Sequence, residues 1–166
     1  GQESHGFSRA ECQHRVSIRK YQERPVENEK ILQILTAGMQ APSACNQQPW
    51  EFYVVTDKEK IGLLSQTTPY AGCAAGAPVV IIPVYRTESL PAPSMIPIDM
   101  GLSLENIWLE TDALGLGGVC IGISPVCRIL QLPDNLKPFC LFPLGYPSEE
   151  RPQQDRFELN RIHFVE

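Results

Sequence analysis

The chain has 166 residues, of which 43% are hydrophobic and 20% charged, and these values fit one globular domain with a single hydrophobic core. Its 14 Lys and Arg against 19 Asp and Glu give a net charge of −5 with no long run of positive charge, which argues against a nucleic-acid partner. No apolar stretch reaches the roughly 20 residues of a membrane span and no basic-then-apolar leader opens the chain, so we expect a cytoplasmic protein without a membrane partner, although a start at Gly1 leaves a removed leader open.

The residues before the first strand predict two helices, an extended segment and a loop. A short helix is expected over residues 9–14, and alternating side chains over 16–21 favour an extended segment. Apolar residues recur at helical spacing over 29–40, which predicts an amphipathic helix with these residues on its apolar face. They are Ile31, Leu32, Leu35 and Met39. A polar loop with a proline near each end follows over 41–49.

Two strands and a helix are predicted next. Residues 50–55 are rich in aromatic and β-branched side chains, which favour a strand. Asp57 is expected to cap a helix over 58–66. Residues 77–85 are apolar on both faces and predict a central strand, in which Pro83 should force a bulge or an edge position.

The third quarter of the chain predicts a connector and a long helix. Residues 86–97 contain several prolines and are expected to connect two elements. Asp99 is expected to cap a helix that runs to Leu114 and ends at glycines. The inner face of this helix is predicted to be Leu104, Ile107, Trp108 and Thr111.

The last part of the chain predicts two strands, one helix and a long tail. We expect strands over 119–123 and 139–144, and a short helix over 126–132 that Ser124 and Pro125 begin. Residues 162–165 are apolar enough for one more strand, at the end of a polar, proline-bearing lead. The expected fold class is α+β, with a mixed central sheet flanked by helices. The chain 1–166 is expected to form one domain whose residues 147–166 are an arm that exchanges with a partner subunit or returns to its own sheet.

The cysteines and histidines do not indicate a metal site. No two cysteines are separated by two residues, and the three histidines are scattered. We therefore expect reduced, mostly buried thiols and no bound metal. The six cysteines are Cys12, Cys45, Cys73, Cys120, Cys127 and Cys140.

Three segments stand outside the core pattern and could bind a ligand. The first, being extended, places Arg15, Ser17 and Arg19 on one face, which suits a phosphate or an anionic ring edge, although a solvated basic face would have the same pattern. Residues 41–50 are rich in amides, which offer a heterocycle both donors and acceptors or satisfy the backbone of the loop itself. Small residues over 115–122 let backbone groups approach a ligand or simply form a tight turn.

Taken together, these segments resemble the FMN-dependent nitroreductase family, from about Arg15 to the C-terminus. The matching motifs are RVSIRKY at 15–21, APS at 41–43, NQQPWEF at 46–52, GLG at 115–117 and GYP at 145–147. The resemblance implies a nitroreductase-like fold and a homodimer whose C-terminal arms embrace the opposite subunit, with FMN bound at the dimer interface.

Motif position in the family also implies roles for single residues. Arg15, Ser17 and Arg156 would hold the phosphate and ribityl chain of FMN. Arg19 would lie at the N1/C2 carbonyl edge of the ring, where a fixed cation stabilises the negative charge of the reduced flavin. No protein side chain is expected to be a covalent catalyst, because the chemistry takes place on FMN.

The loop of the other subunit would complete the ring contacts. Asn46, with Pro42 and Ser43, would reach the pyrimidine, and backbone groups near Ile121 and Gly122 would approach flavin N5. The full set of cofactor-binding residues implied by the resemblance is Arg15, Val16, Ser17, Arg19, Pro42, Ser43, Asn46, Gln48, Cys120, Ile121, Gly122 and Arg156.

Two features of the chain depart from the family pattern. Many members have a basic residue where this chain has Gln154, two positions before Arg156. The segments 67–76 and 87–98 are short where larger members insert helices, which implies a trimmed member with an open or differently covered substrate side.

The implied function is FMN-dependent oxidation of NADH or NADPH and reduction of a small organic acceptor of the nitroaromatic or quinone type, by a ping-pong mechanism. Two alternatives within the superfamily are a flavin-fragmenting enzyme and an iodotyrosine deiodinase, and Asn46 favours the nitroreductase branch over both. A flavin-binding or flavin-storing protein without nicotinamide-dependent turnover is the alternative of another class.

Overall fold

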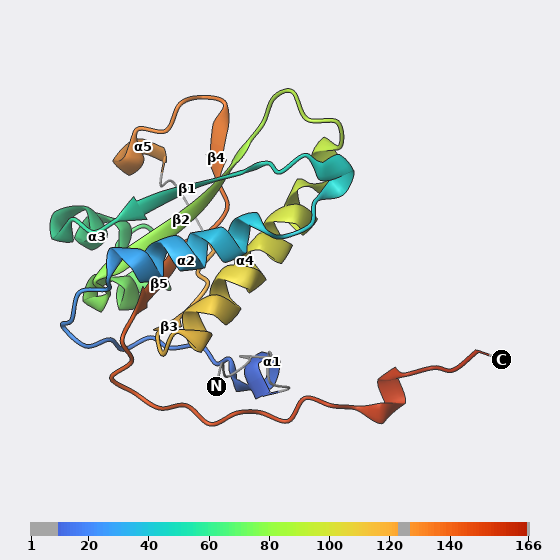
Figure 1. Cartoon of the computed structure of the whole chain (residues 1–166). Helices are drawn as coiled ribbons and strands as arrows, with labels where there is room; N and C mark the ends of the chain where they lie inside the picture. The colour runs from blue at the N-terminus through green and yellow to red at the C-terminus, as the bar shows by residue number, and fades with distance from the viewer. Residues whose placement is uncertain (1–9, 123–126, 166) are drawn as a thin grey trace, which may run out of the picture.

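The computed structural model describes residues 10–122 and 127–165 and shows an α+β fold, in which one sheet is covered on both faces (Figure 1). The strands are β1 (Trp50–Val55), β2 (Val79–Arg86), β3 (Gly117–Gly118), β4 (Leu136–Pro138) and β5 (Phe142–Gly145). Their order is β1-β2-β5-β3, and β4 also pairs with β2. These strand pairs are antiparallel, and a parallel bridge between Ser17 and Gly118 makes the sheet mixed, as predicted.

The helices divide between the two faces of the sheet. Long helices α2 (Asn28–Met39) and α4 (Ile96–Ala113) pack on one face, against Val79 and Ile81. Helix α3 (Lys58–Leu64) and the 3-10 segment η2 (Ala71–Gly76) pack on the other face, with α5 (Cys127–Leu130) beside them. The remaining elements are α1 (Ala10–His14), η1 (Ala44–Asn46), η3 (Pro93–Met95) and η4 (Leu159–Arg161).

Strand β2 lies in the centre of the sheet, so the expectation that Pro83 forces a bulge or an edge position is wrong. Pro83 keeps regular register with Phe52 of β1. On the other side of β2, the partner changes at this point from β5, which pairs with 79–81, to β4, which pairs with 84–86. A residue without an N–H is tolerated there because the ladder on that side is already interrupted.

Helix α2 is amphipathic, but its buried face differs from the predicted one. Ile31 and Ile34 are buried, whereas Leu32 is 63% exposed and Met39 is 53% exposed. The contact face is set by Gly38, where an added Cβ would lie 2.7 Å from the side chain of Ile107 on α4. Close approach at Gly38 turns Ile34 toward the core and leaves two apolar side chains of α2 outside.

Helix α4 begins earlier than predicted. Its first residue is Ile96, so Asp99 lies inside the first turn and is not the N-cap. The Asp99 side chain is 1% exposed and accepts hydrogen bonds from a preceding loop, which is a tertiary role that local sequence does not reveal. The predicted inner face holds for Leu104, Ile107 and Thr111, which are buried, and Trp108 is partly buried.

The later strands also differ from the prediction. The strand expected over 119–123 is shorter and earlier, because β3 covers Gly117–Gly118 and Ile121 adds one bridge to Leu141. The strand expected over 139–144 begins at Phe142, and β4 precedes it as a separate strand. The expected helix start at Ser124 and Pro125 lies outside the described residues. Asp57 does cap α3, accepting a hydrogen bond from Lys60 N (3.0 Å).

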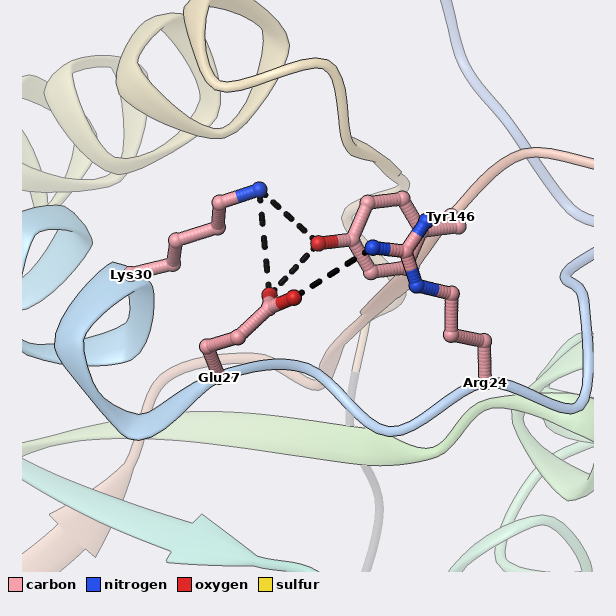
Figure 2. Close-up of polar contacts among 4 residues, drawn as sticks. All are labelled: Arg24, Glu27, Lys30 and Tyr146. Carbon is pink, nitrogen blue, oxygen red and sulfur yellow. Dashed lines mark hydrogen bonds and ion pairs between the residues drawn. The ribbon is translucent and has the colours of Figure 1, made fainter.

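A polar cluster ties the end of the sheet to the start of α2 (Figure 2). The Tyr146 hydroxyl donates to the Glu27 carboxylate and accepts a hydrogen bond from Lys30 Nζ (2.8 Å). This hydroxyl lowers the pKa of Glu27 and raises that of Lys30. The Arg24 guanidinium lies 3.7 Å above the centre of the Tyr146 ring. The cluster fixes the position at which the tail leaves the domain.

The tail beyond residue 150 is exposed and extends away from the body of the domain (Figure 1). The strand considered over 162–165 does not form within the chain, and Phe164 and Val165 are exposed. The free thiols described are those of Cys12, Cys45, Cys73, Cys120 and Cys140, and of these five only Cys140 is buried, so the expectation of mostly buried thiols is wrong for them. Within the described ranges, no group of His, Cys, Asp and Glu side chains could hold a metal. None of the helices in that part of the chain is long and apolar enough to cross a membrane.

Candidate functional site

A cavity lies between the N-terminal segment 12–19 and the tail segment 151–157, and we call it the tail cavity. Its volume is about 820 Å³. Five predicted cofactor-binding residues line it, which brings together parts of the chain more than 130 positions apart. They are Arg15, Val16, Ser17, Arg19 and Arg156.

Arg15 is held in a fixed position in this cavity. Its guanidinium lies 4.2 Å from the centre of the Trp108 ring, and its Nε is 3.8 Å from Glu105 Oε1. Its Nη1 is buried and has no hydrogen-bond partner in the structure. A buried donor without an acceptor costs free energy, so an anionic ligand in the tail cavity would supply the hydrogen-bond acceptor that Arg15 Nη1 lacks.

A second cavity, which we call the glycine cavity, is formed by Arg19, residues 68–70 and residues 119–122. Its volume is about 590 Å³. The predicted residues Cys120, Ile121 and Gly122 lie in its wall, and Arg19 lines both cavities. The two cavities therefore share Arg19, which lies between the arginines of the tail cavity and the segment 119–122 of the glycine cavity.

Glycines position the segment that leads into the glycine cavity. An added Cβ at Gly117 would lie 2.6 Å from the side chain of Ile18, and one at Gly118 would lie 2.6 Å from the Phe142 ring. Ile18 N donates to Gly118 O (3.0 Å), so β3 fixes the segment that carries Arg15 and Arg19. The close packing that glycine permits sets the distance between the two walls of the site.

Arg19 is also tied to the start of the tail. Its backbone N–H donates to Glu149 Oε1 (2.8 Å), and this bond lowers the pKa of Glu149. Lys20 O accepts a hydrogen bond from Ser148 N (3.0 Å), and Tyr21 pairs with Pro147. Burial raises the pKa of the Tyr21 hydroxyl, which donates to Ile18 O (2.6 Å). The basic strand and the tail thus form one connected unit.

Cys120 in the glycine cavity is paired with a second thiol. The interaction between the two thiols lowers the pKa of Cys120 and, together with burial, raises the pKa of Cys140. The side chain of Cys120 packs in the core cluster that contains Phe142 and Trp108. Cys120 therefore belongs both to the core and to the wall of the glycine cavity.

Four predicted residues line neither cavity: Pro42, Ser43, Asn46 and Gln48. Their loop contacts the first turn of α4, whereas β3 follows the last turn of the same helix (Figure 1). Residues 119–122, which line the glycine cavity, come directly after β3 in the chain. An 18-residue helix spans about 27 Å. Within one chain, α4 therefore separates this loop from the other predicted site residues.

Sequence reasoning missed several residues that the structure adds. Arg151 lines the tail cavity and supplies a second tail cation beside Arg156. Gln154 lines the same cavity and accepts a hydrogen bond from Arg156 (3.3 Å). Thr68, Pro69 and Tyr70 form the outer wall of the glycine cavity. A count of arginines in the polar tail would have found Arg151, but no local signal marks residues 68–70.

Comparison with known proteins agrees with this architecture. The model of the nitroreductase family matches residues 12–71 and 62–146. A protein of Methanothermobacter thermautotrophicus named "Putative NADH dehydrogenase/NAD(P)H nitroreductase" is 37% identical over 156 residues, which cover 90% of this chain and 82% of the relative. The chain belongs to the nitroreductase family.

Solved structures have the same fold. A crystal structure described as "Putative NADH Oxidase" from Clostridium acetobutylicum matches with a TM-score of 0.89 and 41% identity, over 94% of this chain and 99% of that chain. A nitroreductase from Desulfovibrio desulfuricans, solved in complex with FMN, matches with a TM-score of 0.86 and 27% identity, over 98% of each chain. The predicted family and fold class are confirmed.

Proposed function

We propose that the protein is an FMN-dependent oxidoreductase that accepts hydride from NADH or NADPH and reduces a small organic acceptor of the nitroaromatic or quinone type in a ping-pong cycle. The observation that carries this proposal is the junction of the two cavities at Arg19. One end offers arginines to a phosphate, and the other offers backbone groups to a flat ring. Relatives with NAD(P)H-dependent and FMN-dependent names support the same activity.

The residues of the tail cavity fit a terminal phosphate. Arg15 has a buried Nη1 without an acceptor, and Arg156 and Ser17 line the same space. Guanidinium groups bind phosphate through parallel, charge-assisted hydrogen bonds. In our proposal Arg15 and Arg156 therefore hold the phosphate of FMN, and Ser17 bonds to the phosphate or the ribityl chain.

The residues of the glycine cavity fit the ring. Bound FMN would supply two-electron hydride chemistry. Arg19 would place a permanent positive charge at the pyrimidine edge of the ring, where negative charge gathers on reduction. Cys120, Ile121 and Gly122 would offer backbone groups to the other side of the ring system. The nicotinamide and the acceptor would use the same open face in turn, beside Thr68, Pro69 and Tyr70.

We also propose that the site is completed by a second copy of the chain. The loop with Pro42, Ser43, Asn46 and Gln48 lies at the far end of α4 from the ring cavity, so in a homodimer it would serve the partner's flavin. Exposed apolar side chains on α2 and α4, and along the tail, support a large interface of this kind. On α2 and α4 they are Leu32, Met39, Ile98 and Leu102.

The test is the identity of the cofactor and its reduction. We expect purified protein to be yellow and to release FMN, not FAD, on heating, as chromatography of the free flavin would show. Anaerobic stopped-flow mixing with NADH and with NADPH should bleach the bound flavin, and a quinone should reoxidise it. A protein that holds FMN but is reduced by neither nicotinamide would be a flavin-storing protein, and FAD as the main flavin would contradict the proposed phosphate site.

A further inference from the structure

The loop 43–48 has a backbone conformation that its sequence does not favour. Cys45, Asn46 and Gln48 have φ values of 51°, 49° and 42°, in the left-handed region that side chains other than glycine rarely adopt. The same three side chains are exposed, so they do not compensate this cost by burial. Such strain persists only where surrounding contacts hold it, and it concentrates at functional sites.

One buried carboxylate holds this loop on both sides of the strained residues Cys45 and Asn46. Asp99 Oδ1 accepts a hydrogen bond from Ala44 N (2.9 Å), immediately before Cys45. Asp99 Oδ2 accepts one from Gln47 Nε2 (2.6 Å), immediately after Asn46. Asp99 is 1% exposed, and its place in the first turn of α4 favours a negative charge because the helix dipole is positive there.

Gln47 extends this contact to a third segment. Its amide also donates to Ala92 O (2.9 Å) and accepts from Ala92 N (3.0 Å), so both polar atoms of the side chain are bonded. Its backbone oxygen accepts a hydrogen bond from Arg86 Nη2 (3.0 Å). The loop is thus anchored to α4, to the connector and to the end of β2.

The anchored loop also orients the side chain that it exposes. Ser43 Oγ accepts a hydrogen bond from Gln48 N (3.0 Å), which closes the turn. Gln48 Nε2 donates to Asn46 Oδ1 (3.0 Å). Asn46 is therefore held in a defined direction at the surface, on a loop whose anchor residues are buried.

We propose that Asp99 and Gln47 are positioning residues, which keep the strained loop in the conformation that presents Asn46 to the flavin of the partner subunit. This inference rests on the proposed function, because it assigns a ligand edge to Asn46. In this proposal Asp99 and Gln47 do not contact the cofactor, and they affect its binding only by positioning Asn46.

The experiment is a double-mutant cycle on the full-length protein, read as the FMN dissociation constant from the flavin fluorescence released on dilution. We expect Asn46→Ala and Asp99→Asn each to weaken FMN binding about three- to tenfold, as the loss of one hydrogen bond would. In the Asn46→Ala background, Asp99→Asn should have almost no further effect. Equal effects in the two backgrounds would mean that Asp99 acts on the fold alone, and would overturn the inference.

Controls separate this result from other failures. Asp57→Asn removes a carboxylate that also accepts a backbone N–H, at a site remote from the loop, and should leave FMN binding unchanged. If Asp99→Asn does not fold, Gln47→Met takes its place in the cycle, because it keeps the carboxylate and its bond from Ala44. If the unmodified protein binds FMN and Asn46→Ala binds it equally well, the inference falls and the proposed function stands. If the unmodified protein binds no FMN, the proposed function itself falls.

Discussion

Arg19 is the side chain that the two cavities share, and its charge should tune the bound flavin. If a fixed cation at the ring edge stabilises the reduced form by about 1.5 to 3 kcal/mol, Arg19→Gln should lower the two-electron potential by roughly 30 to 65 mV. Dye-equilibration measurements on the flavin-loaded protein would show this shift. Arg15→Gln is the matched control, because it should weaken FMN retention and leave the potential unchanged. A flavin-loaded Arg19→Gln protein with the original potential would contradict the assignment.

Glu149 should make the attachment of the tail dependent on pH. Its pKa is lowered in the folded protein by the N–H of Arg19, so its contribution to stability is complete above its ordinary value of 4.5 and is lost as pH falls through the lowered pKa. Glu149→Gln removes this titration. We therefore expect the difference in unfolding free energy between the two proteins, measured in urea, to shrink below about pH 4.5. A difference that stays constant down to pH 3 would exclude this role.

The positions of single side chains were predictable where they depend on local pattern, and not where they depend on distant partners. Arg15, Ser17 and Arg19, which the alternation over 15–19 places on one face, all line one cavity, although Val16 between them lines it too. By contrast, Asp99 is a residue type that commonly caps helices, but its side chain accepts hydrogen bonds from the loop 43–48, more than 50 positions away. The stacking of Arg15 on Trp108 likewise joins residues that no local signal connects.

At the scale of elements, β3 depends on the absence of side chains at its two positions. Gly117→Ala would place a Cβ 2.6 Å from buried, β-branched Ile18, which cannot move without disturbing the segment that carries Arg15 and Arg19. We expect a loss of about 1 to 3 kcal/mol in unfolding free energy, together with weaker FMN binding. Gly62→Ala, inside α3 with nothing within 4 Å of the added Cβ, is the control and should be neutral or stabilising. Equal stability of the two variants would show that the packing at β3 is not tight.

The sequence predicted the bounds of an element where residue types decide them. It did not predict which side chains of a helix are buried when apolar residues lie on more than one face. Strand β1 has the predicted bounds, because all of its residues except Glu51 are aromatic or β-branched. Helix α2 was located correctly, but its spacing pattern includes Leu32 and Met39, which are exposed in the single chain. Periodicity finds an apolar stripe and cannot tell the domain's own core from a surface that a second chain would cover.

For the whole molecule, the proposed exchange between subunits makes a prediction that only a mixed dimer can test. Arg15→Gln damages a chain's own cavity, whereas Asn46→Ala would damage the partner's site. A dimer with one chain of each kind should therefore keep one intact FMN site, formed by the Arg15 of one chain and the Asn46 of the other. Differently tagged chains, purified as the mixed dimer and titrated with FMN, should show one tight site per dimer. No tight site would mean that each chain builds its flavin site alone.

Helix α4 has a further consequence for how the chain tolerates insertions and deletions. Its first turn anchors the Asn46 loop, its middle packs on α2, and its last turn leads into β3. Adding one residue within it would rotate one end against the other by about 100° and lengthen it by about 1.5 Å, so Asp99 and Ile107 could not both keep their partners. Two added turns would nearly restore the faces, but would move the loop about 10 Å farther from β3 and from a partner's flavin. A length change in the connector 87–91 would not turn one end of α4 against the other, so length variation among functional relatives should concentrate in such connectors and leave α4 at a fixed number of residues.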